Sequence, residues 1–367
     1  MTETSLTLLA VGDVILEKPE GEYFLSLAAP VLRKGDVVVG QGEVMFTSRG
    51  ISTFAEFFGP SPGCPPSNIG ALASAGFNVI TLAGNHVWDM GAPGIEDTIT
   101  GLRNYGITPV GAGMNIGEAR RPVIIERGGT RFGFLNYTCV GSIGNWATTL
   151  KPGCAYVHII SHYEMVTGNP GGTPDVYTFA ETRSLKAMVD DVQKLRPLCD
   201  ILVVIFHKGI LHSPDKLAMY DQQVSYAAID AGADLILGHH AHMLKGIEQY
   251  KGKVIFHGIG QFVPAVAGLT EEEFKLRHSR VYGNSNQQQD PAVNLTIIAK
   301  CTIHDGKIKQ VSYLPCLINE RKQPEVLQND DRGRQVFEFV DRITKGSGLN
   351  TKYEWEGDEV VVRTILT

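Results

Sequence analysis

Short, uninterrupted apolar runs alternate with helix-like segments along the first two thirds of the chain, and this alternation constrains the fold most strongly. Runs of this kind are typical of strands buried on both faces of a sheet. Strand–helix–strand alternation pairs strands in parallel and predicts a layered α/β architecture. The predicted strands are Leu6–Val11, Val37–Val39, Asn78–Leu82, Ile201–Phe206 and Leu235–Leu237. The predicted helices are Ser67–Ala75, Gly94–Tyr105, Thr182–Leu195 and Ala218–Ala231.

The pattern changes after about Tyr250, where hairpin signals replace the strand–helix alternation. Two apolar runs, Val293–Ile303 and Ile308–Leu314, flank a polar turn that contains Gly306. A helix is predicted over Arg334–Ile343 and a last strand over Glu359–Arg363. We therefore expect a single domain over residues 1–367, in which 1–262 carry the functional core and 263–367 complete the sheets.

Composition excludes several classes of protein. The 367 residues are 43% hydrophobic and 20% charged, which is typical of an ordinary soluble globular protein with a sizeable core. The formal net charge of −6 gives no basic field for nucleic acid or an anionic membrane. No apolar run approaches the roughly 20 residues of a membrane span, and the N-terminus has no leader-like pattern. The six cysteines form no CxxC pair, so we expect no thiolate zinc site. Because no export signal is recognisable, we expect reduced thiols and a cytoplasmic location.

Polar side chains that bind metals follow each of the five predicted strands. Ligands collect beyond the carboxyl ends of strands in α/β sheets, so these residues converge if the strands are neighbours. Each has an ordinary structural interpretation, such as an Asx turn for Asp13 or a core histidine for His207, but three histidines within five residues are harder to explain that way. Carboxylate, amide and imidazole donors suit one divalent ion, namely Mn, Fe, Zn, Mg or Ca. The candidates are Asp13, Glu43, Asn85, His86, His207, His239, His240 and His242.

His86 and Asp89 form a separate candidate pair. They lie three residues apart and share one face if a helix begins after Asn85. A carboxylate beside an imidazole fixes its tautomer and raises its basicity, which is typical of a general acid or base. The alternative is that Asp89 only stabilises the N-terminus of that helix by its charge.

These motifs resemble the CapA family of poly-γ-glutamate biosynthesis, a branch of the calcineurin-like metallophosphoesterases. The matching segments span nearly the whole chain and include LLAVGDVIL, VGQGEV, TLAGNHVWDMG, IFHKG and LGHHAHMLKGIE. The resemblance implies a calcineurin-like four-layer α/β sandwich with its metal site at the carboxyl ends of strands. It also implies that His86 and Asp89 transfer protons beside that metal.

The same resemblance implies which residues bind metal: Asp13, Glu43, Asn85, His207, His239 and His242. Three histidines lie within 239–242, so the choice of His239 and His242 as the two that face the metal stays open. With that choice, His240 is left for proton transfer together with Asp13. The chain departs from the phosphoesterase pattern at Ile15, where a histidine is usual, and at Glu43, where an aspartate is usual. Both departures favour one ion over two.

Three functions remain open. A hydrolase would cleave an ester, phosphoester or amide with a metal-activated water. A peptide epimerase, as in the lasso-peptide branch of CapA-like proteins, would remove and return a Cα proton. A non-catalytic binding module would keep the fold alone. We expect a peptide or small molecule as partner, with no nucleic acid and no membrane; the substrate and the oligomeric state are open.

Overall fold

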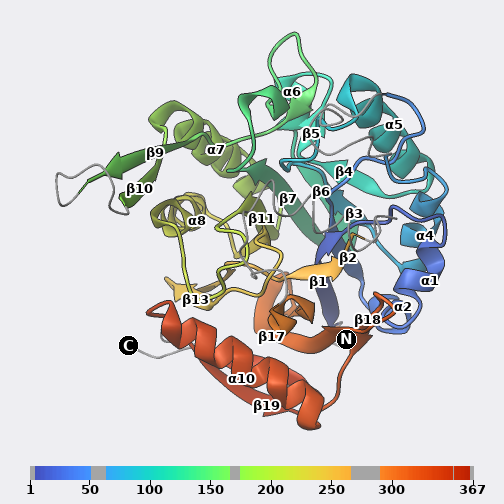
Figure 1. Ribbon diagram of the computed structural model, residues 1–367, viewed down its shortest axis with the longest axis vertical. Helices are drawn as coiled ribbons and strands as arrows, with labels where there is room; N and C mark the ends of the chain where they lie inside the picture. The colour runs from blue at the N-terminus through green and yellow to red at the C-terminus, as the bar shows by residue number, and fades with distance from the viewer. Residues whose placement is uncertain (1–4, 51–62, 166–173, 266–289, 350, 364–367) are drawn as a thin grey trace.

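A ten-stranded sheet forms one half of the protein (Figure 1). The computed structural model describes residues 5–50, 63–165, 174–265, 290–349 and 351–363. The main strand order is β19-β20-β17-β16-β1-β2-β3-β4, with β15 beside β1 and β18 beside β17. Strands β1 to β4 are parallel, and β16 joins β1 antiparallel. The strands are β1 (Leu6–Val14), β2 (Val37–Gly42), β3 (Val79–Thr81), β4 (Thr108–Val110), β15 (Gln261–Val263), β16 (Leu295–His304), β17 (Lys307–Ile318), β18 (Pro324–Val326), β19 (Lys352–Glu356) and β20 (Glu359–Arg363).

A six-stranded sheet forms the other half, in the order β13-β14-β12-β11-β7-β6. Its four central strands are parallel and its two edge strands are antiparallel to their neighbours. The five predicted strands are thus divided between the two sheets, three in the first and two in the second. The strands of the second sheet are β6 (Val123–Arg127), β7 (Thr130–Thr138), β11 (Ile201–Lys208), β12 (Leu235–His240), β13 (Ile247–Tyr250) and β14 (Lys253–Phe256).

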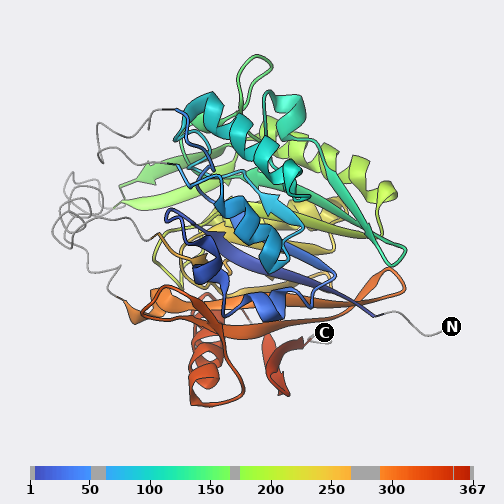
Figure 2. The ribbon, with the colours of Figure 1, turned by 90° about the vertical axis from the view of Figure 1, so that its right-hand side faces the viewer.

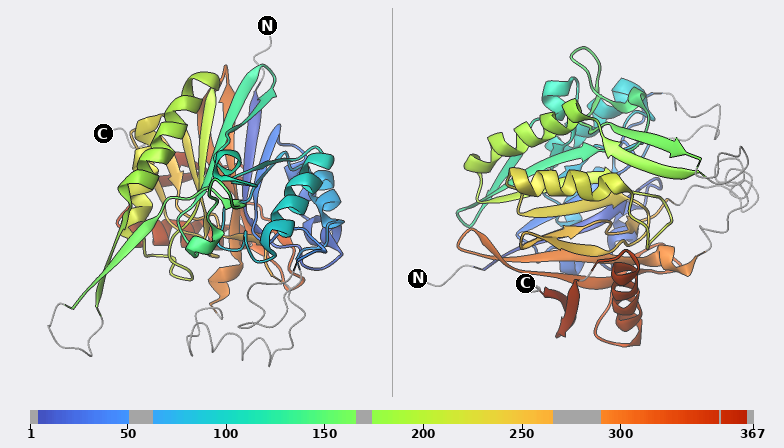
Figure 3. Two further views of the ribbon diagram at one scale, coloured as in Figure 1. Left: turned by 90° about the horizontal axis from the view of Figure 1, so that it is seen from above. Right: turned by 90° about the vertical axis from the view of Figure 1, so that its left-hand side faces the viewer.

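Helices cover the outer faces of both sheets, so the layers run helix, sheet, sheet, helix (Figure 3). This confirms the predicted four-layer α/β sandwich. The helices of the first sheet are α1 (Gly21–Leu25), α2 (Ala29–Leu32), α4 (Asn68–Ala75) and α5 (Gly91–Asn104). Those of the second sheet are α7 (Thr182–Leu195) and α8 (Met219–Ala231), while α10 (Asp331–Gly346) packs beside β17 and β13. Among the described residues, no helix is both long and apolar enough to cross a membrane.

Alternating side chains of the central strands build three cores. In β1, Leu8 and Ala10 face the second sheet, whereas Leu9 and Val11 face the helices. In β11, alternate residues from Ile201 onward join the core between the sheets, and the residues between them pack under α7 and α8. Such strands have no solvent-facing side, which explains their uninterrupted apolar runs.

Short elements at the carboxyl ends of the strands complete the fold. Helix α6 (Ile116–Ala119) lies beside a small pair formed by β5 (Ala112–Gly113) and β8 (Gly153–Cys154). A two-stranded ribbon, β9 (Ile159–Glu164) and β10 (Asp175–Ala180), projects from the body (Figure 2). These elements surround the edge at which the polar strand ends meet.

Candidate metal centre

A cluster of two carboxylates and one imidazole joins the two sheets. Asp13 lies near the carboxyl end of β1, Glu43 directly follows β2, and His242 follows β12. One ligand atom from each of the three lies within 4.8 Å of the others. The Nε2 atom of His242 is 2.9 Å from Oε1 of Glu43. Among the described residues, Oδ1 of Asp13 is buried and has no hydrogen-bond partner, which fits a site for a cation.

A second donor set lies around Asn85, which follows β3. Its Oδ1 atom is 2.7 Å from Nε2 of His207 and 3.2 Å from Nδ1 of His240. Both histidines are buried. Burial, reinforced by neighbouring histidines, lowers the pKa of His207 well below its usual value and that of His240 to about 3. Both rings are therefore neutral at pH 7, and neutral imidazole is the form that binds metals.

The charges of the first cluster are strongly perturbed. Burial and then the nearby charge of Glu43 raise the pKa of Asp13 well above its usual value. Burial acts in the same direction on Glu43, but the charge and hydrogen bond of His242 bring the pKa of Glu43 well below its usual value. Burial lowers the pKa of His242, but the charge and hydrogen bond of Glu43 outweigh burial and raise this pKa above its usual value. A divalent ion fits here because it would neutralise both buried carboxylates.

His86 and Asp89 lie at the exposed side of this cluster. The Nδ1 atom of His86 is 2.6 Å from Oδ2 of Asp89, although the two residues lie in a turn and α5 begins only at Gly91. Its Nε2 atom is 3.8 Å from Oε1 of Glu43. The side chain of His86 is 36% exposed, whereas that of Glu43 is fully buried. Burial lowers the pKa of His86, but the Asp89 hydrogen bond and the surrounding carboxylates raise it to about 9.

Buried amides hold the turn that carries Asn85 and His86. Asn136 of β7 accepts a hydrogen bond from the backbone N–H of Ala83 at 2.7 Å and donates to the carbonyl of Ile205 at 3.2 Å. Asn145 donates to the carbonyl of Asn85 at 2.6 Å. The turn is therefore fixed to the second sheet although it belongs to the first.

His239 lies apart from both donor sets. Its Nε2 atom donates to the carbonyl of Val11 at 3.1 Å, and this bond links β12 to β1. Burial lowers the pKa of His239 to about 4. His240 and His242 have φ angles of 88° and 55°, a left-handed conformation that non-glycine residues adopt rarely. The structure thus brings His240 and His242 toward the carboxylates and amide, with His239 behind them.

Two residues near the centre were missed by the sequence analysis. Gln41 is fully buried at the end of β2, and its Oε1 accepts from the hydroxyl of Thr81 at 2.5 Å. A Cβ atom on Gly84 would meet Nε2 of Gln41 and the ring of His207, which places Gln41 at the edge of the site. Glu17 adds a negative charge that raises the pKa of His86. Gln41 had a detectable signal, since it lies two residues before Glu43, just after the predicted strand Val37–Val39.

The chain matches a known family over most of its length. The family model described as "Bacterial capsule synthesis protein PGA_cap" matches residues 7–265. The chain is 28% identical over 268 residues to the capsule biosynthesis protein CapA of Bacillus anthracis, covering 70% of this chain and 59% of that protein. It is 30% identical over 307 residues to the probable polyglutamine synthesis accessory protein Rv0574c of Mycobacterium tuberculosis, covering 82% and 71%. The chain therefore spans about three fifths of the length of the CapA protein.

Solved structures resemble the chain more distantly. A hypothetical protein from Thermus thermophilus is 15% identical with a TM-score of 0.44, covering 87% of this chain and 96% of that one. The calcineurin-like phosphoesterase YfkN from Bacillus subtilis is 13% identical with a TM-score of 0.42, covering 93% and 98%.

Proposed function

The chain belongs to the family of bacterial capsule synthesis proteins that the PGA_cap model describes, and from this premise we propose that it is a metal-dependent acid–base enzyme acting on a peptide-like substrate. One observation carries the proposal. The His86–Asp89 pair, at 2.6 Å, lies beside Glu43 of the carboxylate–imidazole cluster. A proton carrier next to a cation site can serve acyl transfer, where the ion polarises the carbonyl, or proton transfer at Cα.

The ion is proposed to bind to Asp13, Glu43 and His242, with Asn85, His207 and His240 as the adjoining donor set. His240 replaces His239 in our assignment, because the ring of His239 bonds to Val11 instead. Once bound, a divalent ion would supply Lewis-acid polarisation of a substrate carbonyl or phosphoryl group. Elemental analysis of purified protein tests the assignment: we expect one equivalent, and two equivalents would show that both donor sets hold an ion.

The protein's own groups then handle the proton. Asp89 holds Nδ1 of His86, so that Nε2 is the nitrogen left to face the substrate. The exposed position of His86 lets Nε2 reach a substrate atom above the buried Glu43. In amide hydrolysis, His86 would donate its Nε2 proton to the leaving amine. Because relatives are named for capsule and polyglutamine synthesis, poly-γ-glutamate is the substrate to try first.

The hydrolase form is tested by incubating metal-loaded protein with poly-γ-glutamate and measuring new amine ends by fluorescent labelling. We expect turnover that chelator removes and that His86→Gln lowers about 100-fold or more while the metal content stays unchanged. His304→Gln, a histidine of β16 outside the cluster, is the matched control and should keep full activity. Equal activity in the His86→Gln variant would refute the assigned role.

A peptide epimerase is the second candidate, since a second imidazole–carboxylate pair, His242 with Glu43 at 2.9 Å, lies next to the first. In this alternative His242 and Glu43 would exchange protons, and the ion would be held by Asn85, His207 and His240 instead. Asp13 does not pair with the ring of His240 but accepts from its backbone N–H at 3.2 Å, so the expected His240–Asp13 pair is replaced here. Candidate peptides are incubated in deuterated water and weighed by mass spectrometry. Deuterium at Cα without new amine ends supports epimerisation and excludes hydrolysis; substrate binding with neither product supports a non-catalytic binding module.

A further inference from the structure

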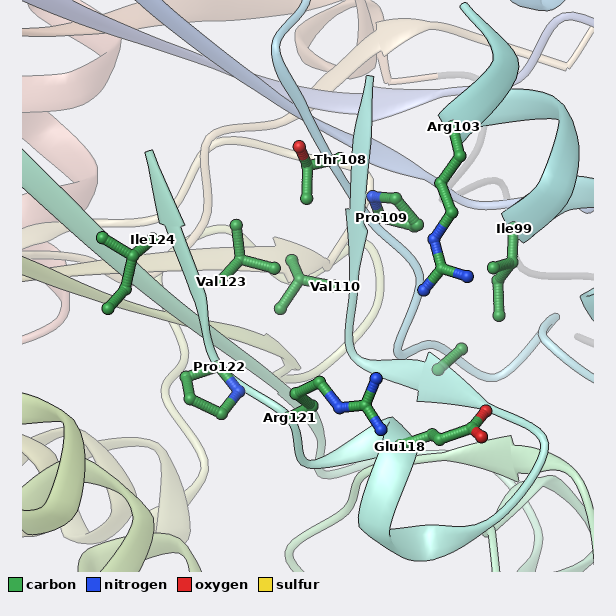
Figure 4. Close-up of a pocket in the computed structure, with 11 residues that line it drawn as sticks. Ile99, Arg103, Thr108, Pro109, Val110, Glu118, Arg121, Pro122, Val123 and Ile124 are labelled. Atoms are coloured by element: carbon green, nitrogen blue, oxygen red, sulfur yellow. The ribbon is translucent and has the colours of Figure 1, made fainter. Parts of the chain in front are cut away.

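A cavity of about 260 Å³ lies between the edge strands of the two sheets, away from the metal centre (Figure 4). Strand β4 ends the first sheet and β6 ends the second, so the cavity fills the open side of the sandwich. None of the metal-centre residues lines it. Val110 and Val123 form part of its wall and also belong to, or pack against, the core between the sheets.

Two guanidinium groups and one carboxylate occupy the polar side of this cavity. Arg103 comes from the last turn of α5, Arg121 follows α6, and Glu118 lies within α6. In Figure 4 the two arginine side chains point toward each other across the space, with Glu118 beside Arg121. Among the described residues, neither guanidinium group forms a hydrogen bond or an ion pair. One oxygen of Glu118 accepts from the backbone N–H of Met114 at 3.0 Å.

Both guanidinium groups are solvent-exposed and line the cavity, so a ligand can reach them. Seven of the fourteen described arginines have a carboxylate partner, as Arg120 has Asp191 and Arg332 has Glu325, whereas Arg103 and Arg121 have none. An anion between two facing guanidinium groups would be attracted by both. Guanidinium groups also bind carboxylates through two parallel hydrogen bonds, which gives them directional preference.

The charge pattern identifies the ligand class. Two guanidinium groups and one carboxylate complement a molecule with two carboxylates and one ammonium group. The remaining walls, including Ile99, Val110 and Pro122, suit a short methylene chain. We propose that this cavity, which we call the edge pocket, binds a free acidic α-amino acid such as glutamate. This proposal does not rest on the function proposed for the metal centre.

Isothermal titration of the full chain with L-glutamate tests the proposal. Saturable binding with one site per chain is expected, and it should persist in EDTA and in Glu43→Gln, because Glu43 lies outside the edge pocket. Loss of binding under either condition would place glutamate at the metal centre and overturn the proposal. Absence of saturable binding up to millimolar glutamate would overturn it as well.

Protein variants and ligand analogues test what each of the three charged side chains contributes to glutamate binding. Arg103→Ala and Arg121→Ala should each weaken L-glutamate binding about tenfold or more, since each removes charge-assisted hydrogen bonds. Glu118→Gln should weaken the binding of glutamate but not the binding of glutarate, because glutarate lacks the ammonium group. Arg334→Ala, an exposed arginine of α10, is the matched control and should leave the affinity unchanged. Inorganic phosphate that binds as tightly as glutamate, or arginine variants with unchanged affinity, would refute recognition of an amino acid.

Discussion

At the scale of single residues, Asn136 shows how a buried amide supports the centre without being part of it. Replacing it with alanine removes the acceptor of the Ala83 N–H and the donor to the Ile205 carbonyl. A buried group left unpaired costs about 1–3 kcal/mol. We expect Asn136→Ala to lower the free energy of unfolding by about that amount in urea denaturation. Asn104→Ala, at an exposed position of α5, should change it by less than about 0.5 kcal/mol; an equal loss in both variants would contradict this role.

The buried carboxylates predict that metal removal destabilises the protein. Asp13 and Glu43 repel each other within the core, and an ion that binds only the folded state adds about 2.7 kcal/mol at 100 times its dissociation constant. Thermal unfolding with saturating metal and with EDTA should differ by a few degrees. Glu43→Gln should abolish this difference. Glu325→Gln, which alters only a surface pair with Arg332, should retain it, and an unchanged shift in Glu43→Gln would place the ion elsewhere.

The histidines of 239–242 show which part of the site the sequence could predict. The segment was recognisable because three histidines follow one strand, but its motif did not say which rings face the metal. In the structure His240 and His242 face Asn85 and Glu43, whereas His239 bonds to the carbonyl of Val11. What the sequence did not show is the left-handed backbone at His240 and His242, because it depends on contacts with β1 and with Glu43.

At the scale of elements, the N-terminus of α10 depends on one capping side chain. Asp330 accepts hydrogen bonds from the backbone N–H groups of Arg332 and Gly333. Replacing such a cap with alanine typically costs about 1 kcal/mol. We expect this loss for Asp330→Ala in chemical denaturation. Asp331→Ala is the matched control, because the side chain of Asp331 is 99% exposed and makes no capping bond; similar losses for both would indicate a general charge effect instead.

The elements with strong hydrophobic patterns were predicted well, and the failures have local causes. Helix α7 was predicted at its observed bounds, Thr182–Leu195. The hairpin of β6 and β7 was not predicted, although its turn is Gly128–Gly129, both at positive φ, which is a typical two-residue hairpin connection. The division of the parallel strands between two sheets was also not visible from alternation alone. Local patterns do not encode which strands become neighbours across more than a hundred residues.

At the scale of the molecule, the centre exists only where the two sheets meet. The first sheet supplies Asp13, Glu43 and Asn85, and the second supplies the histidines at the carboxyl ends of β11 and β12. The contacts between Asp13 and His240 and between Asn85 and His207 cross this boundary. Packing of the sheets and assembly of the site are therefore the same event, so changes deep in the shared core should alter metal affinity as well as stability.

The pairing of the C-terminal strands with β1 predicts that the segment matched by the family model does not fold alone. The match ends at residue 265, but β16 pairs with β1 from Leu6 to Ala10 and contributes Ile297 and Cys301 to the core between the sheets. Without β16, the Leu6–Ala10 part of β1 becomes an open edge, which promotes aggregation. We expect the full chain to unfold in one cooperative transition, and fragment 1–265 to be insoluble or to unfold without cooperativity, as measured by circular dichroism and calorimetry. A soluble fragment that unfolds cooperatively and binds metal like the full chain would contradict the single-domain prediction and make 266–367 a separate unit.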